Sequence, residues 1–152
     1  MINIRPKLTV VVCLALIAVI SIMVWTILRT NRLESAAQEL AITVSEESFT
    51  ADYPAALIDN LHPDYLAQIS QRSLLRYLNN VTQRLGPLDS LVSISGNLDI
   101  PLMAIGTRPT SANYEVELSF RNTPASLQLE MLLTNNQWLI SKFDIVADVL
   151  AN

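Results

Sequence analysis

Near its amino terminus the chain contains a long apolar run without a charged side chain. The run extends from Leu8 to Leu28 (LTVVVCLALIAVISIMVWTIL). At about 1.5 Å of rise per residue, a helix of this length spans roughly 30 Å, which is the thickness of the hydrocarbon core of a bilayer. The pattern therefore predicts a transmembrane anchor over residues 8–28, preceded by a short head over residues 1–7.

Two other interpretations of the apolar run stay open at this stage. A secretory signal has a shorter apolar region of about 7–15 residues, followed by small residues at its cleavage site. The triplet at residues 35–37 (SAA) would suit a peptidase, but it lies behind Arg29, Arg32 and Glu34. This favours an uncleaved anchor over a cleaved signal. The third interpretation is the buried core helix of a globular domain.

The flanking charges bear on the orientation of the anchor. Arg5 and Lys7 precede the span and Arg29 and Arg32 follow it, so the basic residues are nearly balanced. A short basic head is favoured on the cytoplasmic side of a membrane. We therefore predict a single-pass protein of the bacterial inner membrane, with a cytoplasmic head and a periplasmic C-terminal domain. The lipid bilayer is its first expected partner, through Leu8–Leu28.

Beyond the span the apolar positions recur at helical spacing. Glutamates at 34, 39, 46 and 47 occupy the other faces. This pattern predicts one helix that continues from the membrane over residues 29–48. The positions that share its apolar face are Leu33, Ala37, Leu40, Val44 and Ser48.

Three shorter helices are predicted between residues 52 and 87 by their start and stop signals. Proline in the first turn marks two of the starts, at residues 52–54 (DYP) and 62–64 (HPD). Ser70 can cap the third and longest helix. Gly86 and Pro87 end that helix. Its apolar face carries Leu74, Tyr77, Leu78, Val81 and Leu85.

From Leu88 onward the apolar period changes to two, which is typical of half-buried strands. Asn135 and Asn136 favour a tight hairpin turn, because asparagine tolerates positive φ. Helices followed by antiparallel strands predict an α+β fold, with an N-terminal transmembrane helix and then helices packed on a curved antiparallel sheet of about four strands. The expected inward positions are Val92, Ile94, Leu98 and Ile100; Tyr114, Val116, Leu118 and Phe120; Ala125, Leu127, Leu129, Met131 and Leu133; and Trp138 with Ile140.

The last predicted strand changes its apolar phase in the middle. Trp138 and Ile140 share one parity, whereas Phe143 and Ile145 share the other. In a regular strand the two pairs would point to opposite faces. A β-bulge at residues 141–142 adds one residue and re-aims the side chains that follow. We therefore predict a bulge there, with all four side chains in the interior.

These features resemble the nuclear transport factor 2-like superfamily, a cone-shaped α+β fold that is also called cystatin-like. The resemblance rests on helices ending in RLGPL and on the strands YEVELSF and ASLQLEMLLTNNQWLISKFDIV, and it covers about residues 33 to 147. It is closest to small bacterial membrane-anchored domains of uncharacterised function. Their last hairpin has a tryptophan, a hydrophobic residue two positions on, and an aromatic residue before an isoleucine. One departure is Asn135-Asn136, where relatives often have Asp-Gly.

The resemblance implies a nuclear transport factor 2-like domain over residues 33–148. This fold hosts enzymes, binding modules and assembly components alike. Periplasmic components of type IV secretion inner-membrane complexes share the layout of a short head, a single span and such a domain. By this analogy we expect a membrane-tethered, non-enzymatic interaction or assembly domain of the bacterial cell envelope. Its partner is another protein or a second copy, and the outward positions expected near such a contact are Glu115, Glu117, Gln128 and Glu130.

The distribution of charge argues against a nucleic-acid partner. The chain has 10 basic and 14 acidic residues. All of the acids and 8 of the basic residues lie from residue 29 onward, which gives that part a net charge of −6. A domain with this charge repels phosphate backbones.

Few residues of the chain suit a metal site or a catalytic site. His62 is the single histidine, and Cys13, the single cysteine, lies within the predicted span. A zinc site would therefore need carboxylates alone. His62 precedes a proline at a helix junction, where a capping or surface role is expected. We expect no catalytic residue, no metal and no cofactor.

The alternative function is a cone that binds a small ligand or acts like a ketosteroid isomerase. Such sites pair a carboxylate base with tyrosine or protonated-acid donors in an apolar pocket. Asp99 is a carboxylate of the required type, but its parity points outward. Core packing is the simpler interpretation of the aromatic and methionine positions. The candidate pocket residues are Tyr65, Tyr77, Met103, Met131, Trp138 and Phe143.

Overall fold

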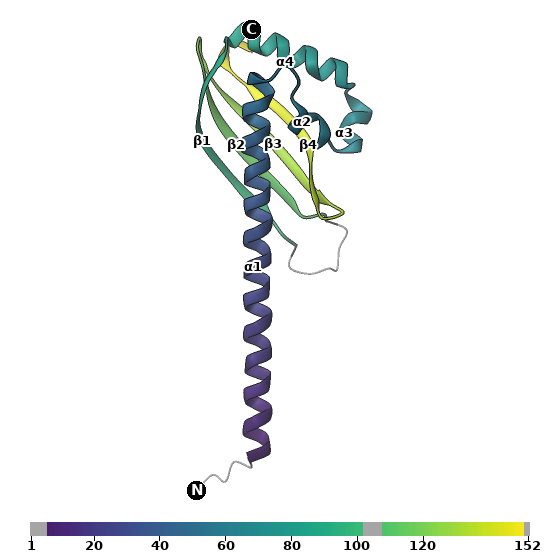
Figure 1. Ribbon diagram of the computed structural model, residues 1–152, viewed down its shortest axis with the longest axis vertical. Coiled ribbons are helices and arrows are strands. Elements are labelled where there is room, and N and C mark those ends of the chain that lie inside the picture. Colours follow the sequence, from purple (N-terminus) through teal and green to yellow (C-terminus); the bar gives the residue numbers. More distant parts are fainter. Residues whose placement is uncertain (1–5, 102–107, 151–152) are drawn as a thin grey trace. The chain divides into compact units, whose positions relative to one another are not determined.

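The computed structural model describes residues 6–101 and 108–150, and it confirms the predicted α+β class (Figure 1). The chain divides into two compact units, Met1–Ser35 and Ala36–Asn152. The elements in chain order are α1 (Pro6–Thr50), α2 (Ala55–Asp59), α3 (Pro63–Gln68), α4 (Gln71–Leu85), β1 (Leu88–Asp99), β2 (Ser111–Phe120), β3 (Pro124–Thr134), β4 (Gln137–Val146) and the 3₁₀ turn η1 (Asp148–Leu150).

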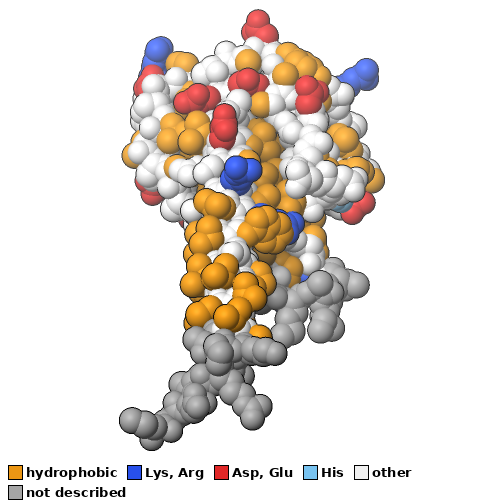
Figure 2. Space-filling view, turned by 60° about the horizontal axis from the view of Figure 1, so that its bottom comes forward, with side chains coloured by type: hydrophobic (Ala, Val, Ile, Leu, Met, Phe, Trp, Pro, Cys, Tyr) orange, Lys and Arg blue, Asp and Glu red, His pale blue; other side chains and the backbone are white. Residues whose placement is uncertain are grey.

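The first part of α1 is long and apolar enough to cross a membrane, by length and composition. Every large apolar side chain described from Val10 to Leu28 is at least half exposed. Hydrophobic side chains accordingly cover the surface of this segment (Figure 2). An exposed apolar surface of this extent is suited to lipid rather than to water.

The polar groups of the apolar segment are satisfied within the helix itself. The Ser21 hydroxyl donates to the Ile17 carbonyl at 2.8 Å, and the Thr26 hydroxyl donates to the Ile22 carbonyl at 2.8 Å. At the carboxyl end of the segment the Arg29 guanidinium lies 5.5 Å from the centroid of the Trp25 ring. Arginine and tryptophan at this end match the composition of a membrane–water interface.

The helix α1 continues through residues 29–48, as predicted, and ends at Thr50. From Ala37 onward its inward positions recur every three or four residues, and they contribute to the core of the second unit. Phe49 packs edge to face against Phe120, with ring centroids 5.1 Å apart. The fully or nearly fully buried residues of α1 are Ala37, Ala41, Val44, Ser45, Ser48 and Phe49.

Local signals define the ends of the shorter helices much as the sequence predicted. The Ser73 amide donates to the Ser70 hydroxyl at 3.2 Å, and the Asp64 amide donates to His62 Nδ1 at 3.2 Å. His62 is therefore the N-cap of α3. Gly86 ends α4 with φ 85° and ψ −176°. This region of backbone space is accessible essentially to glycine alone, which explains why glycine stands there.

The four strands form one antiparallel sheet in the order β1-β2-β3-β4. One face of the sheet packs against the helices of this unit (Figure 1). The tight turn between β3 and β4 has φ 51° at Asn135 and φ 63° at Asn136, which confirms the predicted hairpin. The buried side chains of the strands are Ala112, Tyr114, Val116, Leu118, Phe120, Ala125, Leu127, Leu129, Met131, Trp138, Ile140, Phe143 and Ile145.

The predicted bulge in the last strand is confirmed. Glu130 pairs with Lys142, whereas the next residue, Met131, pairs with Ile140. Ser141 is thus the extra residue, and its hydroxyl donates to the Glu130 carbonyl at 3.1 Å. The parity change is absorbed at this point, so that Trp138, Ile140, Phe143 and Ile145 are all 5% exposed or less.

The prediction for β1 was wrong at Val92, which is 62% exposed. The cause is a pair of register shifts that leave Asp89 and Val92 as extra residues in the pairing with β2. Each shift changes the phase of the strand. The half-buried positions are therefore Leu88, Leu91, Ile94 and Leu98, with spacings of three, three and four.

Candidate functional site

The outer edge of β4 is covered at Ile140 by the segment between α2 and α3. The Ile140 amide donates to the Asn60 carbonyl at 2.7 Å, and the His62 amide donates to the Ile140 carbonyl at 2.8 Å. Leu61 forms an isolated parallel bridge with Ile140. This contact satisfies both backbone groups that Ile140 presents at the edge of the sheet.

Two tyrosines cover the rest of this edge beyond the bulge. The Tyr65 hydroxyl donates to the Phe143 carbonyl at 3.3 Å, and the Ile145 amide donates to the Tyr77 hydroxyl at 3.4 Å. Burial raises the pKa of both phenols above the ordinary value of 10.0. For Tyr77 the hydrogen bond from Ile145 lowers the pKa, but by less than burial raises it. Both side chains therefore remain neutral near pH 7.

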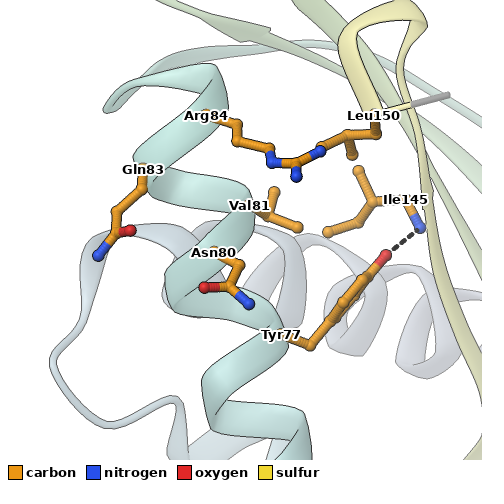
Figure 3. A pocket seen from close by; sticks show the side chains of 7 residues that line it. All are labelled: Tyr77, Asn80, Val81, Gln83, Arg84, Ile145 and Leu150. Carbon is orange, nitrogen blue, oxygen red and sulfur yellow. Dashed lines mark hydrogen bonds between the residues drawn. The ribbon is translucent and has the colours of Figure 1, made fainter. Parts of the chain in front are cut away.

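A hollow of ≈ 460 Å³ lies between α4, the carboxyl end of β4 and η1 (Figure 3). Its apolar part is formed by Val81 and Ile145, which are 2% and 5% exposed, together with the half-buried Leu150. The described residues that line it are Tyr77, Asn80, Val81, Gln83, Arg84, Ile145 and Leu150.

The polar groups of this hollow are mostly hydrogen-bond donors. The Tyr77 hydroxyl oxygen accepts a hydrogen bond from the Ile145 amide, so the hydroxyl proton is available to donate a second hydrogen bond. Arg84 extends from α4 toward Leu150, and Asn80 lies between Arg84 and Tyr77 along the helix (Figure 3). Gln83 points away from them. No carboxylate is among the described lining residues, and the nearby Asp144 lies on the opposite face of β4 from Ile145.

The structure distributes the candidate pocket residues over different environments. Tyr77 lines the hollow, whereas Tyr65 covers the β4 edge. Met131, Trp138 and Phe143 are 0%, 5% and 4% exposed and lie in the core between sheet and helices. Met103 lies outside the described residues. Tyr77 is therefore the one candidate that the described hollow contains.

Sequence reasoning missed Arg84 and Asn80 as site residues, because both lie beside the apolar face of their helix. A usable signal was present. Positions 77, 80, 81 and 84 are spaced by three, one and three residues, so they share one face of a helix. Tyr77 and Arg84 are about two helical turns apart on that face, and the core residue Val81 lies between them.

Catalytic groups are sparse in the described part of the chain. Within residues 6–101 and 108–150, no group of three or more His, Cys, Asp or Glu side chains could hold a metal ion. His62 is occupied as a helix cap. Asp99 is exposed at the end of β1, with the outward direction expected from its parity.

The fold and the site define an α+β domain that follows an apolar helix long enough to cross a membrane. Comparison of the chain with protein-family models, with curated proteins and with solved structures finds no match.

Proposed function

We propose that this protein is a membrane-tethered, non-enzymatic interaction domain of the bacterial cell envelope, with a nuclear transport factor 2-like domain on the periplasmic side of the inner membrane. The observation that carries this proposal is α1. An uncharged, mostly apolar and exposed segment from Val10 to Leu28 and a core-forming segment from Ala37 to Phe49 belong to one uninterrupted helix. Such a helix ties a folded domain to a bilayer.

The outer face of the sheet is the surface that we propose for the partner. Glu115, Glu117 and Glu130 are exposed there and Gln128 is half-buried, as the alternation predicted. The Ser93 hydroxyl donates to Glu117 Oε2 at 2.8 Å, and the Ser126 hydroxyl donates to Glu115 Oε1 at 2.7 Å. These bonds hold two carboxylates of β2 in place. The excess of acid favours a basic protein surface over a second copy of this acidic domain.

Photo-crosslinking in the native envelope tests this surface. A photoreactive residue at Gln128 should give one discrete adduct, and the combined change Glu115→Lys and Glu117→Lys should abolish it because like charges then face the partner. The matched control is Glu39→Lys with Glu46→Lys, since both acids are exposed on α1. The proposal fails if no adduct forms, or if the control changes the adduct as strongly.

Orientation is tested separately by reporter fusions. Alkaline phosphatase fused after Asn152 should be active in a bacterial host, because the enzyme matures only outside the cytoplasm. A fluorescent protein that folds only in the cytoplasm should remain dark at the same position. The opposite pair of results would place the domain in the cytoplasm and contradict the envelope assignment.

The hollow at α4 favours a second candidate function, the binding of a small ligand. The observation in its favour is that hydrogen-bond donors surround an apolar floor, with no carboxylate among the described lining residues. A ligand-binding role and a tethered interaction role are compatible in one domain.

A further inference from the structure

We propose that the hollow between α4, β4 and η1 binds a small organic monocarboxylate with an apolar body. The carboxylate would lie between Arg84 and the Tyr77 hydroxyl, and the apolar body would lie on Val81, Ile145 and Leu150. This site is distinct from the outer face of the sheet, so that it extends the proposed interaction function without depending on it.

The size and the floor of the hollow define the apolar part of the ligand. A volume of ≈ 460 Å³ falls within the roughly 300–1,000 Å³ of typical small-molecule sites. Val81 and Ile145 are core residues that line this space, and the half-buried Leu150 lines it beside them. An apolar body that covers them removes their surface and its own from water, which favours binding.

The polar rim defines the charge of the ligand. Arg84 forms no ion pair within the described residues, and its planar guanidinium matches the two oxygens of a carboxylate. The Tyr77 hydroxyl already accepts a hydrogen bond from the Ile145 amide, which polarises it as a donor. Asn80 adds an amide on the same side. Arginine is the single charged residue in the described lining, so a monoanion is neutralised more completely than a dianion.

Other ligand classes fit less well. A cation would meet Arg84 and would find no carboxylate among the lining residues that the structure describes. A free inorganic anion would leave the apolar floor exposed to water. Asp144, which raises the pKa of Tyr77 through its charge, is exposed and points to the other face of β4. It repels a bound carboxylate weakly, because solvent screens an exposed charge.

Nuclear magnetic resonance of the methyl groups in the full chain, held in lipid nanodiscs, tests the proposal. The probe is 3-phenylpropionate, and the matched probes are 3-phenylpropanol, which has no charge, and 3-phenylpropylamine, which has the opposite charge. We expect saturable shifts of the Val81, Ile145 and Leu150 methyl groups with the carboxylate. We expect affinity that is lower by about tenfold or more for the alcohol and no localised shift for the amine.

Variants with matched controls assign the binding to the named groups. Arg84→Gln should reduce affinity by about tenfold or more, whereas Arg76→Gln, on the same helix but outside the hollow, should leave it unchanged. Tyr77→Phe should weaken binding, and Tyr65→Phe, which alters the same sheet edge, should not. The inference is overturned if the carboxylate gives no saturable shift, if Arg84→Gln binds as tightly as the original chain, or if the alcohol binds equally well. Because Arg84 is exposed, its variant is expected to fold.

Discussion

At the scale of single residues, the tyrosines of this domain differ in what their rings and hydroxyls meet. Tyr65 and Tyr77 place a hydroxyl on the edge of β4. Tyr53 is half exposed and its hydroxyl accepts from Gln71 Nε2 at 3.0 Å. Tyr114 is 8% exposed and lies opposite Gly96 in the pairing of β2 with β1. Its ring occupies the space that a side chain at position 96 would need.

The contact between Tyr114 and Gly96 gives a stability prediction. A Cβ at position 96 would overlap the Tyr114 ring and lie 2.6 Å from the Asn113 carbonyl oxygen. Because backbone is one of the two obstacles, relief requires the strands to move. We expect Gly96→Ala to destabilise the domain by about 1–3 kcal/mol, the usual cost of overpacking. Chemical unfolding measures it, with the exposed neighbour Ser95→Ala as control, and equal stability of both variants would contradict the prediction.

The two aromatic residues on either side of the bulge give a second prediction. Trp138 and Phe143 have opposite parity, yet they are 5% and 4% exposed. Truncation of a buried aromatic residue typically costs about 3–5 kcal/mol. Both Trp138→Ala and Phe143→Ala should therefore lower the melting temperature strongly, while Val146→Ala, at a position that is 51% exposed, should change it little. A nearly unchanged melt for either aromatic variant would refute the inward placement of both.

At the scale of elements, the two edge strands of the sheet are protected from pairing with a further strand in different ways. The β4 edge is covered from Ile140 to Ile145 by backbone at Asn60 and His62 and by the two tyrosine hydroxyls. The β1 edge instead contains two register shifts, and bulges discourage pairing with another strand. Both features make it less favourable for a strand of another molecule to pair with the edges of the sheet.

The cover of β4 can be tested at one hydrogen bond. In Tyr77→Phe the Ile145 amide loses its acceptor in a partly buried position, and an unsatisfied group of this kind costs about 1–3 kcal/mol. We expect faster hydrogen exchange at Ile145 and a modest loss of stability. Tyr53→Phe is the matched control, because its hydroxyl is exposed and bonds a side chain. Unchanged exchange at Ile145 in Tyr77→Phe would show that the bond does not protect the edge.

The elements differ in how far the sequence could predict them. The bulge in β4 was predictable because Trp138, Ile140, Phe143 and Ile145 are all large and apolar. They are expected to be buried together, yet a regular strand would point the two pairs to opposite faces. The bulges in β1 were not predictable. Asp89 and Val92 have small polar neighbours, which are tolerated on either face of a strand and so do not reveal a change of phase. Val92 also fitted a regular alternation. The hydroxyl cover of β4 joins residues 78 and 68 positions apart. Contacts of this kind depend on tertiary placement, for which spacing along the chain holds no signal.

At the scale of the whole molecule, composition is divided sharply along one helix. The described part of α1 from Val10 to Leu28 exposes apolar side chains and has no charged residue, and the first charged residue after it is Arg29. The second unit has its own core, built from Ala37 to Ala147. Changes in the apolar segment should therefore alter where the protein resides without altering how its domain folds.

Lysine substitutions in the span test this division. Ile17 and Ile20 lie near the centre of the apolar segment and are 60% and 58% exposed. Moving a lysine to the centre of a membrane helix costs about 2.5–3.5 kcal/mol on insertion scales, and replacing isoleucine removes a further favourable contribution of about 0.3–0.6 kcal/mol. Together, Ile17→Lys and Ile20→Lys should release the protein from membranes washed with alkaline carbonate, whereas Ile17→Leu with Ile20→Leu should leave it in the pellet. The released variant should keep the melting temperature of the original domain. Retention of the lysine variant in the pellet would contradict the anchor. If mass spectrometry shows that the unmodified protein starts after Ala37, the apolar segment is a cleaved signal instead.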